Sequence, residues 1–203
     1  MLITCLAFTK QIKPWQIEAA LQSFNDQSYQ DKQLIIINNH DTNRECQQLE
    51  IIYNYNITII DRPGYSNGKA LLEGLQLGAG QVIAHFPLDH IHHSNRLEWC
   101  LDDLVKSKST IIAPSRKWKW TNGPEIITEE SNIIPELAFF KSPAYTDDYE
   151  IDYGAWWQYP LLAHEQGIDI IEIDKLLAIE LPSEKPTDKN YYAFLAQSMN
   201  VYR

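Results

Sequence analysis

Cysteine is scarce in this chain of 203 residues, and its cysteines are not paired by spacing. Cys5, Cys46 and Cys100 are odd in number and far apart in the sequence. No Cys-x-x-Cys spacing occurs, so the sequence indicates neither a zinc knuckle nor a disulfide framework. We therefore expect reduced thiols and a cytoplasmic protein.

Long apolar runs are missing as well. No run approaches the roughly 18 residues that a membrane span needs, so we expect no span. The first residues, MLITCLAFTK, contain only a short apolar run and no cleavage-site pattern. We therefore expect no signal peptide.

Positive charge is the third deficit. The chain has 17 Lys and Arg against 27 Asp and Glu, and its formal net charge is −10. This balance argues against wide contact with nucleic acid or with anionic lipid, both of which select basic surfaces. It still allows a small phosphate pocket, because a helix N-terminus and one cation can hold a phosphate locally.

Short apolar strands and helical patterns alternate through the first half of the chain. Near-continuous apolar strands that alternate with helices predict an α/β fold with a mostly parallel sheet and helices on both faces. In such sheets, ligands bind beyond the carboxyl ends of the strands. Strands are expected at 2–8, 33–38, 56–60, 81–86 and 110–115. Helices are expected at 14–24, 44–53 and 94–107, and residues 66–80 are expected to form a loop, a helix and a glycine stop. The loops that should form a site are 8–13, 38–43, 61–68 and 87–93.

The second half has a different pattern. Residues 116–148 are rich in Trp, Pro, Asn, Glu and Lys, and we expect irregular structure and short hairpins with one strand at ELAFF. Residues 149–167 are expected to be helical with a kink at Pro160. Residues 168–173 are expected to form a strand, and an amphipathic helix should close the chain. The length suits a single domain.

The stretch HFPLDHIHH, residues 85–93, follows a predicted buried strand. It holds one carboxylate, Asp89, among four histidines, so it is either a metal site or an ordinary strand exit. His90, His92 and His93 do not match a fixed zinc spacing. Any one of them could supply a nitrogen ligand to Mn²⁺, but we interpret each as an exposed loop histidine. Asp89 can hold a hard cation such as Mg²⁺ or Mn²⁺, or it can cap the following turn or helix.

Five stretches occur in an order that is typical of one family. They are ITCLAFTKQIKPWQIEAALQSFNDQSY, IIINNHDTN, GYSNGKALLEGLQLGAGQVIAHFPLDHIHHSNRLE, AFFKSPAY and EIDYGAWWQYPLLAHEQG. Together they resemble family 2 glycosyltransferases of the GT-A fold. The resemblance implies a Rossmann-like three-layer sandwich over residues 1–203. Residues 1–115 would be its nucleotide-binding half, and residues 116–203 its acceptor-binding and catalytic half.

The resemblance also implies an activity. Family members transfer a sugar from a nucleotide donor with inversion, so we expect a UDP-sugar as donor, Mn²⁺ or Mg²⁺ as cofactor, and a saccharide or other hydroxyl as acceptor. Asp89 matches the second carboxylate of the family's metal motif, whereas Pro87 replaces the first. Asp152 matches the family's general base, with Ile151 in place of the preceding Glu. A shift of one helical turn would favour Asp148 or Glu150 instead, and Asp147 is a further competitor.

Several residues are expected to bind the nucleotide, some because they match family positions and others because they lie in the loops after the strands. Asn39 stands where the family has an Asp that contacts uracil, and Asn38 is the alternative one residue earlier. Glycines can admit close approach of the backbone, although a structural turn explains them equally well. The expected contacts are Thr9, Asn39, Asp61, Gly64, Lys69 and Leu88.

The aromatic cluster of Trp118, Trp120, Trp156 and Trp157 could stack on sugar rings, but packing in the core explains it at least as well. A second hypothesis is a member of the same fold that binds a nucleotide or partner without turnover. A nucleotidyltransferase is disfavoured, because FTKQIKPW after the first strand has no glycine. The sequence leaves the oligomeric state open.

Overall fold

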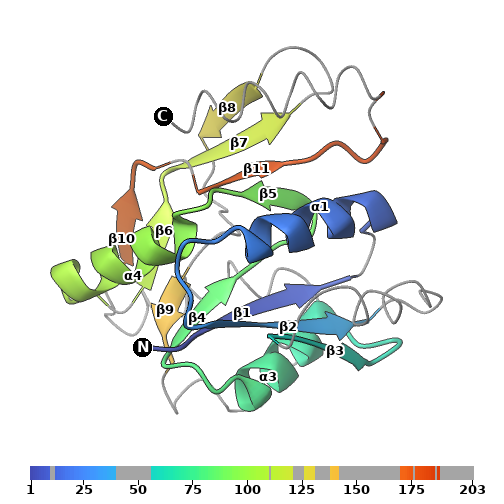
Figure 1. The fold of residues 1–203 in the computed structure, drawn as a ribbon, viewed down its shortest axis with the longest axis horizontal. Coiled ribbons are helices and arrows are strands. Elements are labelled where there is room, and N and C mark those ends of the chain that lie inside the picture. Colours follow the sequence, from blue (N-terminus) through green and yellow to red (C-terminus); the bar gives the residue numbers. More distant parts are fainter. Residues whose placement is uncertain are drawn as a thin grey trace.

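The protein is described here as a computed structural model, which covers residues 1–9, 12–39, 56–109, 111–120, 126–130, 138–141, 170–175, 177–185 and 187. Within these ranges the chain forms a large sheet, a smaller sheet and three helices (Figure 1). The predicted helix at 44–53 and the predicted helix at 149–167 lie outside the described residues.

The large sheet has seven strands in the order β10-β6-β9-β4-β1-β2-β3. β1 pairs in parallel with β2 and β4, β2 with β3, and β6 with β10. Only β9 is antiparallel to its neighbours, β4 and β6, so the predicted mostly parallel sheet is confirmed. Its strands are β1 (Ile3–Phe8), β2 (Lys32–Asn38), β3 (Ile57–Asp61), β4 (Val82–His85), β6 (Ile111–Pro114), β9 (Ala138–Phe140) and β10 (Ile170–Ile173).

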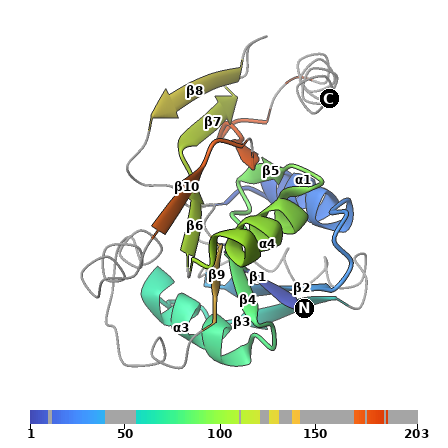
Figure 2. The ribbon, with the colours of Figure 1, turned by 90° about the vertical axis from the view of Figure 1, so that its left-hand side faces the viewer.

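Helices cover both faces of this sheet, as Figure 2 shows. α1 (Pro14–Asn25) and α4 (Arg96–Ser107) pack on one face, and α3 (Asn67–Leu77) packs on the other. Successive strand residues point to opposite faces, so Cys5 and Ala7 join the core under α1 and α4 whereas Leu6 joins the core under α3. The three-layer arrangement expected from the sequence is therefore confirmed.

Local signals in the sequence explain where the helices begin. α1 starts at Pro14, whose fixed φ suits the first helical position. α3 starts after Ser66, whose hydroxyl accepts the backbone N–H of Lys69 at 3.2 Å. This cap satisfies one of the N–H groups that the first helical turn leaves unpaired.

The smaller sheet contains two strands that the sequence did not predict, at residues 90–92 and 178–180. Its order is β5-β11-β7-β8, with β5 (His90–His92), β7 (Arg116–Trp120), β8 (Ile126–Glu130) and β11 (Ala178–Glu180). The segment 87–93 was expected to be a loop, but β5 pairs antiparallel with β11, so that Ile91 faces Ile179. Trp120 is buried in a cluster with Ile179 and Leu181, which supports its core interpretation.

One buried side chain joins this sheet to α1. The Gln16 amide donates to the carbonyls of Leu181 and Pro182 at 3.3 and 3.0 Å, and its oxygen accepts the N–H of Lys13 at 2.9 Å. Gln16 thus caps α1 and ties the helix to the end of β11. Across the described ranges, no helix combines the length and the apolar character that a membrane crossing requires.

Candidate functional site

Three polar side chains form a hydrogen-bonded chain across the carboxyl ends of three parallel strands. Thr9 follows β1, Asn38 ends β2 and Asp61 ends β3. The Thr9 hydroxyl donates to Asn38 Oδ1 at 2.7 Å, and Asn38 Nδ2 donates to Asp61 Oδ1 at 2.7 Å. A carboxylate only accepts, so the amide nitrogen must face Asp61 and the amide oxygen must face Thr9. These hydrogen-bonded side chains of Thr9, Asn38 and Asp61 form the strand-end chain. The strand-end chain orients the exposed carboxylate of Asp61 at this edge of the sheet.

Asn39 connects the end of β2 to the loop between β3 and α3. Its side chain is buried, and Nδ2 donates to the carbonyl of Tyr65 at 3.2 Å and to Asn67 Oδ1 at 3.0 Å. These bonds hold the loop between β3 and α3 against the end of β2. The predicted contact of Asn39 with a nucleobase stays a prediction.

The loop from β3 to α3 contains a tight turn. The N–H of Tyr65 donates to the carbonyl of Arg62 at 3.1 Å, and Gly64 has a φ of 79°. Residues other than glycine rarely adopt this conformation, so the turn accounts for Gly64. Lys69 lies exposed in the first turn of α3. Contacts of Gly64 and Lys69 with a nucleotide stay predictions.

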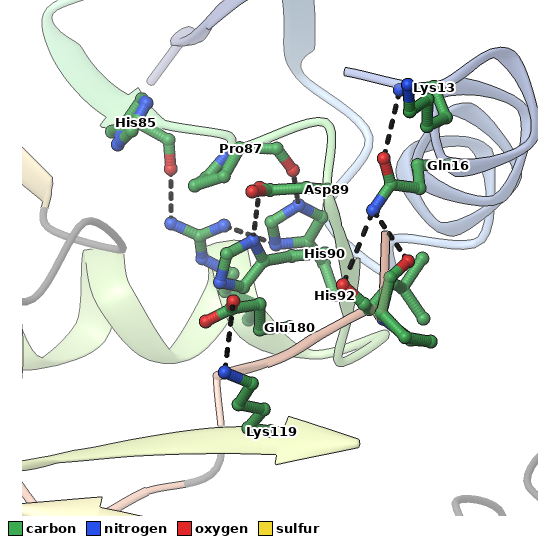
Figure 3. Close-up of polar contacts among 12 residues, drawn as sticks. Lys13, Gln16, His85, Pro87, Asp89, His90, His92, Lys119 and Glu180 are labelled. Carbon is green, nitrogen blue, oxygen red and sulfur yellow. Dashed lines mark hydrogen bonds and ion pairs between the residues drawn. The ribbon is translucent and has the colours of Figure 1, made fainter. Parts of the chain in front are cut away.

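Asp89 lies in the turn between β4 and β5, beyond the carboxyl end of β4 (Figure 3). Its side chain is 35% exposed, and Oδ1 lies 2.6 Å from Nδ1 of His90. Burial tends to raise the pKa of Asp89, but the charge and hydrogen bond of His90 bring that pKa below its usual value. The carbonyl of Asp89 accepts the N–H of Leu181 at 2.7 Å, so β11 anchors the turn. Asp89 thus presents an ionised, partly exposed carboxylate.

The histidines after Asp89 are not exposed, and that prediction is wrong. His90, His92 and His93 have relative exposures of 2%, 3% and 4%. Because β5 pairs with β11, its alternate residues His90 and His92 face inward, and His93 stacks on Trp99 with ring centroids 4.2 Å apart. The side chains of all three therefore belong to the protein interior.

A fully buried arginine lies beneath the Asp89 turn. Arg96 Nη1 lies 2.5 Å from Nδ1 of His92, and Nη2 donates to the carbonyl of His85. Nε2 of His92 lies 2.9 Å from the carbonyl oxygen of Pro87. Burial, and next the charge of Arg96, hold the pKa of His92 well below its usual value, so His92 is neutral. Because a guanidinium only donates, His92 Nδ1 accepts and the proton resides on Nε2.

The chemistry of Asp89 fits a hard divalent cation, though as a single protein ligand. Mg²⁺ and Mn²⁺ favour carboxylate oxygens, and Mg²⁺ sites commonly combine one or two carboxylates with substrate phosphates and water. Among the described residues, no group of three or more His, Cys, Asp or Glu side chains could hold a metal ion. Within the described ranges, Asp89 is thus the one candidate ligand at this turn, and the oxygens of a bound diphosphate could complete the coordination of a cation.

Other predicted site residues take positions that narrow their roles. Leu88 is buried in the main core, so only its backbone is available to a ligand. Thr9 is buried and its hydroxyl is engaged with Asn38, so it orients that amide. Asp152 lies outside the described residues and its role stays a prediction. The competing acids Asp147, Asp148 and Glu150 and the tryptophans Trp156 and Trp157 lie outside them too.

The sequence analysis did not single out Arg96, and it considered His92 only as an exposed loop histidine or as a nitrogen ligand for Mn²⁺. A helical signal for Arg96 was present, because Arg96, Cys100 and Leu104 recur every four residues and all three are buried. An arginine on the apolar face of a helix is unusual enough to flag. Asn38, named only as an alternative to Asn39, is the central member of the strand-end chain.

Comparison with known proteins gives one family. The family model described as Glycosyl transferase family 2 matches residues 14–155. No curated protein matches the chain. The matched range includes the strand-end chain from Asn38 to Asp61, the Asp89 turn and Asp152.

Solved structures share the fold at low sequence identity. Staphylococcus aureus TarS in complex with UDP-GlcNAc matches with a TM-score of 0.74 and 12% identity, over 99% of this chain and 66% of that one. The mannosyltransferase PcManGT from Pyrobaculum calidifontis, in complex with GDP-Man and Mn²⁺, matches with a TM-score of 0.70 and 13% identity, over 98% and 64%. Another TarS structure matches with a TM-score of 0.69 and 13% identity, and the chain spans 39% of it. These likenesses show the GT-A fold.

Proposed function

The chain belongs to glycosyl transferase family 2, and from that premise we propose that it is an inverting glycosyltransferase with a UDP-sugar as donor. The observation that carries the proposal is the hydrogen-bonded chain from Thr9 through Asn38 to Asp61, at the edge where parallel sheets bind ligands. The turn that presents Asp89 leaves the same edge of the sheet at β4. The two features supply a nucleoside end and a diphosphate end.

Asp61 is the group best suited to select the base. Its carboxylate is exposed, and one oxygen is held by Asn38 Nδ2 at 2.7 Å. Uracil offers one ring N–H donor between two carbonyls, and a carboxylate accepts such a donor through a charge-assisted bond. The Asp61 carboxylate is therefore compatible with the uracil of UDP, and the Asn39 amide oxygen is a second proposed contact.

The diphosphate would lie between the β3–α3 loop and the Asp89 turn. Lys69 stands exposed in the first turn of α3, where the helix dipole also favours an anion. The Gly64 turn and the backbone of Leu88 are the further proposed contacts. Asp89 would hold Mn²⁺ or Mg²⁺, which neutralises the charge that builds on a leaving diphosphate.

Asp152 is the proposed general base. In a single displacement, its carboxylate would take the proton of the acceptor hydroxyl while that oxygen bonds to the sugar's anomeric carbon and the bond to the diphosphate breaks. Attack opposite the leaving group inverts the anomeric configuration. A positioned base of this kind contributes about 10²–10⁴-fold to the rate. The acceptor is proposed to be a saccharide or another hydroxyl compound, and the location in the cytoplasm stays a prediction.

A second candidate function has its own support. Pro87 stands where the family motif has its first carboxylate, and the described residues contain no cluster of three potential metal ligands. Both observations favour a member of the family that binds a nucleotide without turnover. The two candidates share the strand-end chain and differ at the Asp89 turn.

Calorimetry with UDP, GDP, CDP and dTDP, each with and without Mn²⁺, tests the proposal. We expect UDP to bind most tightly and Mn²⁺ to strengthen its binding. Release of UDP from UDP-sugars in the presence of a panel of saccharide acceptors then separates the two candidates. A wild-type chain that binds none of the nucleotides under either condition would refute both.

A further inference from the structure

Backbone carbonyls at and before the Asp89 turn are hydrogen-bonded by buried side chains. Pro87 has neither an N–H nor a polar side chain, so its carbonyl is the polar group through which it can be fixed. That carbonyl receives Nε2–H of His92 at 2.9 Å, and Nδ1 of His92 lies 2.5 Å from Nη1 of Arg96. The second guanidinium nitrogen donates to the carbonyl of His85, the last residue of β4. Arg96 therefore contacts the carbonyl of His85 directly and reaches the carbonyl of Pro87 through His92.

Burying the charged side chain of Arg96 costs free energy, which points to a role beyond packing. Arg96 has no exposed surface, and within the described part of the chain no carboxylate forms an ion pair with it. Its Nε finds no hydrogen-bond partner there either. The effective penalty for burying a charge is several kcal/mol, and apolar residues of similar volume are often at least as stable in such positions. Arg96 does stack over Phe86, with its guanidinium carbon 5.4 Å from the ring centroid, which offsets part of that cost.

We propose that Arg96 and His92 are positioning residues that set the Pro87–Asp89 turn, so that the Asp89 carboxylate meets the cation and diphosphate of the donor. The inference rests on the proposed function. His92 works as a neutral relay: it accepts from a permanent cation on one side and donates to the Pro87 carbonyl on the other. This backbone restraint organises the turn from which the family's first carboxylate is missing. Side chains that orient a metal ligand in this way typically change metal affinity about 10- to 100-fold when they are replaced.

Two substitutions of His92 separate positioning from packing. His92→Gln keeps one acceptor for Arg96 and one donor for Pro87, whereas His92→Leu has a similar volume and keeps neither. We expect His92→Leu to weaken Mn²⁺-dependent UDP binding about 10- to 100-fold in calorimetry and His92→Gln to restore most of the loss. UDP binding without metal should stay within about twofold in both. Leu104→Ala, a core change in α4, the helix that carries Arg96, controls for lost stability and should leave both affinities unchanged.

Nuclear magnetic resonance of the ligand-free chain gives a readout that needs no donor. In the wild type, the ¹⁵N shifts of His92 should show the Nε2–H tautomer at neutral pH. In His92→Leu, but not in Leu104→Ala, ¹⁵N relaxation should show increased motion of the Leu88 and Asp89 amides. If His92→Leu does not fold, the tautomer of His92 in the wild type and the metal affinity of His92→Gln still test the positioning role of His92.

Different experimental results would contradict the positioning role and the proposed function. A wild-type chain that binds UDP with Mn²⁺, together with His92→Leu that binds it equally well, would overturn the positioning role alone. The Nδ1–H tautomer at His92 would overturn it as well. A wild-type chain that binds no nucleotide at all would count against the proposed function, while the relaxation data would still report on the turn.

Discussion

His93 offers a test at the level of a single residue, because its burial makes the stability of the protein depend on pH. Burial lowers the pKa of His93 from 6.5 to about 4. As the pH falls below 6.5, the unfolded chain takes up a proton that the folded chain resists, so the unfolded state binds more protons and stability decreases. The stability is fully present above pH 6.5 and is lost progressively as the pH falls toward 4.

The expected loss at His93 is on the order of 2 kcal/mol between pH 7.5 and 4.5. Urea unfolding at these two pH values measures it. His93→Asn keeps an acceptor for the N–H of Asn95, which His93 Nδ1 accepts at 3.0 Å, and removes the titrating ring. The variant should therefore lose less stability on acidification than the wild type does. Equal losses in the two proteins would contradict the assignment.

The same histidines show which residues can be judged from the sequence. Asp61 and Asp89 were placed correctly at strand ends, because short apolar runs mark where β3 and β4 stop. The burial of His90 and His92 could not be read from their neighbours. It arises from pairing of β5 with β11, which is about 90 residues away in the chain. No local pattern encodes such a partner.

Among the secondary-structure elements, α1 and β11 are joined through Gln16. The side-chain Nε2 of Gln16 donates to the carbonyls of Leu181 and Pro182, and its Oε1 caps α1 by accepting the N–H of Lys13. We expect Gln16→Leu to lower the free energy of unfolding by about 1–3 kcal/mol, because buried backbone groups lose their partners. Gln22→Leu is the matched control, since Gln22 is exposed on the same helix and bonds only Asp26 among the described residues.

Denaturant unfolding and amide hydrogen exchange together check the Gln16 prediction. Gln22→Leu should change stability by less than about 0.5 kcal/mol. In Gln16→Leu, exchange should rise first at the amides of Ile179 in β11 and of Leu181 directly after it. If Gln16→Leu and Gln22→Leu were equally stable, the link between helix and sheet would carry no net energy.

Element prediction succeeded where local pattern and final environment agree. The parallel strands β1 and β2 are continuous apolar runs buried on both faces, and the sequence marks them clearly. β9 was expected as a strand, but its place between β4 and β6 and its reversed direction depend on long-range pairing. β11 is only three residues long and was missed, because so short a segment carries no periodicity.

Over the whole molecule, the two predicted halves share one sheet. β9 and β10 come from the predicted second half, residues 116–203, yet they pair with β4 and β6 of the first half. The division at residue 115 therefore describes predicted roles rather than separate sheets, and it stays a prediction. A shared sheet means that the core under α4 draws on both parts of the chain, since Leu97 and Ile173 belong to one cluster.

The proposed reaction divides its work between these halves, and substitutions on either side should fail in different ways. Asp152→Asn should leave Mn²⁺-dependent UDP binding within about twofold and reduce sugar transfer about 10²–10⁴-fold, because only the base is lost. Asp89→Asn should weaken the Mn²⁺-dependent part of UDP binding and leave metal-free binding unchanged.

Two neighbouring acids serve as controls for Asp152. Asp148→Asn and Glu150→Gln each remove one negative charge close to Asp152 in the sequence and should leave the rate of sugar transfer within about threefold. Calorimetry and UDP release with the acceptor panel measure both effects. If Glu150→Gln rather than Asp152→Asn abolishes transfer, the base lies two residues earlier; if Asp152→Asn abolishes UDP binding, its role is structural rather than catalytic.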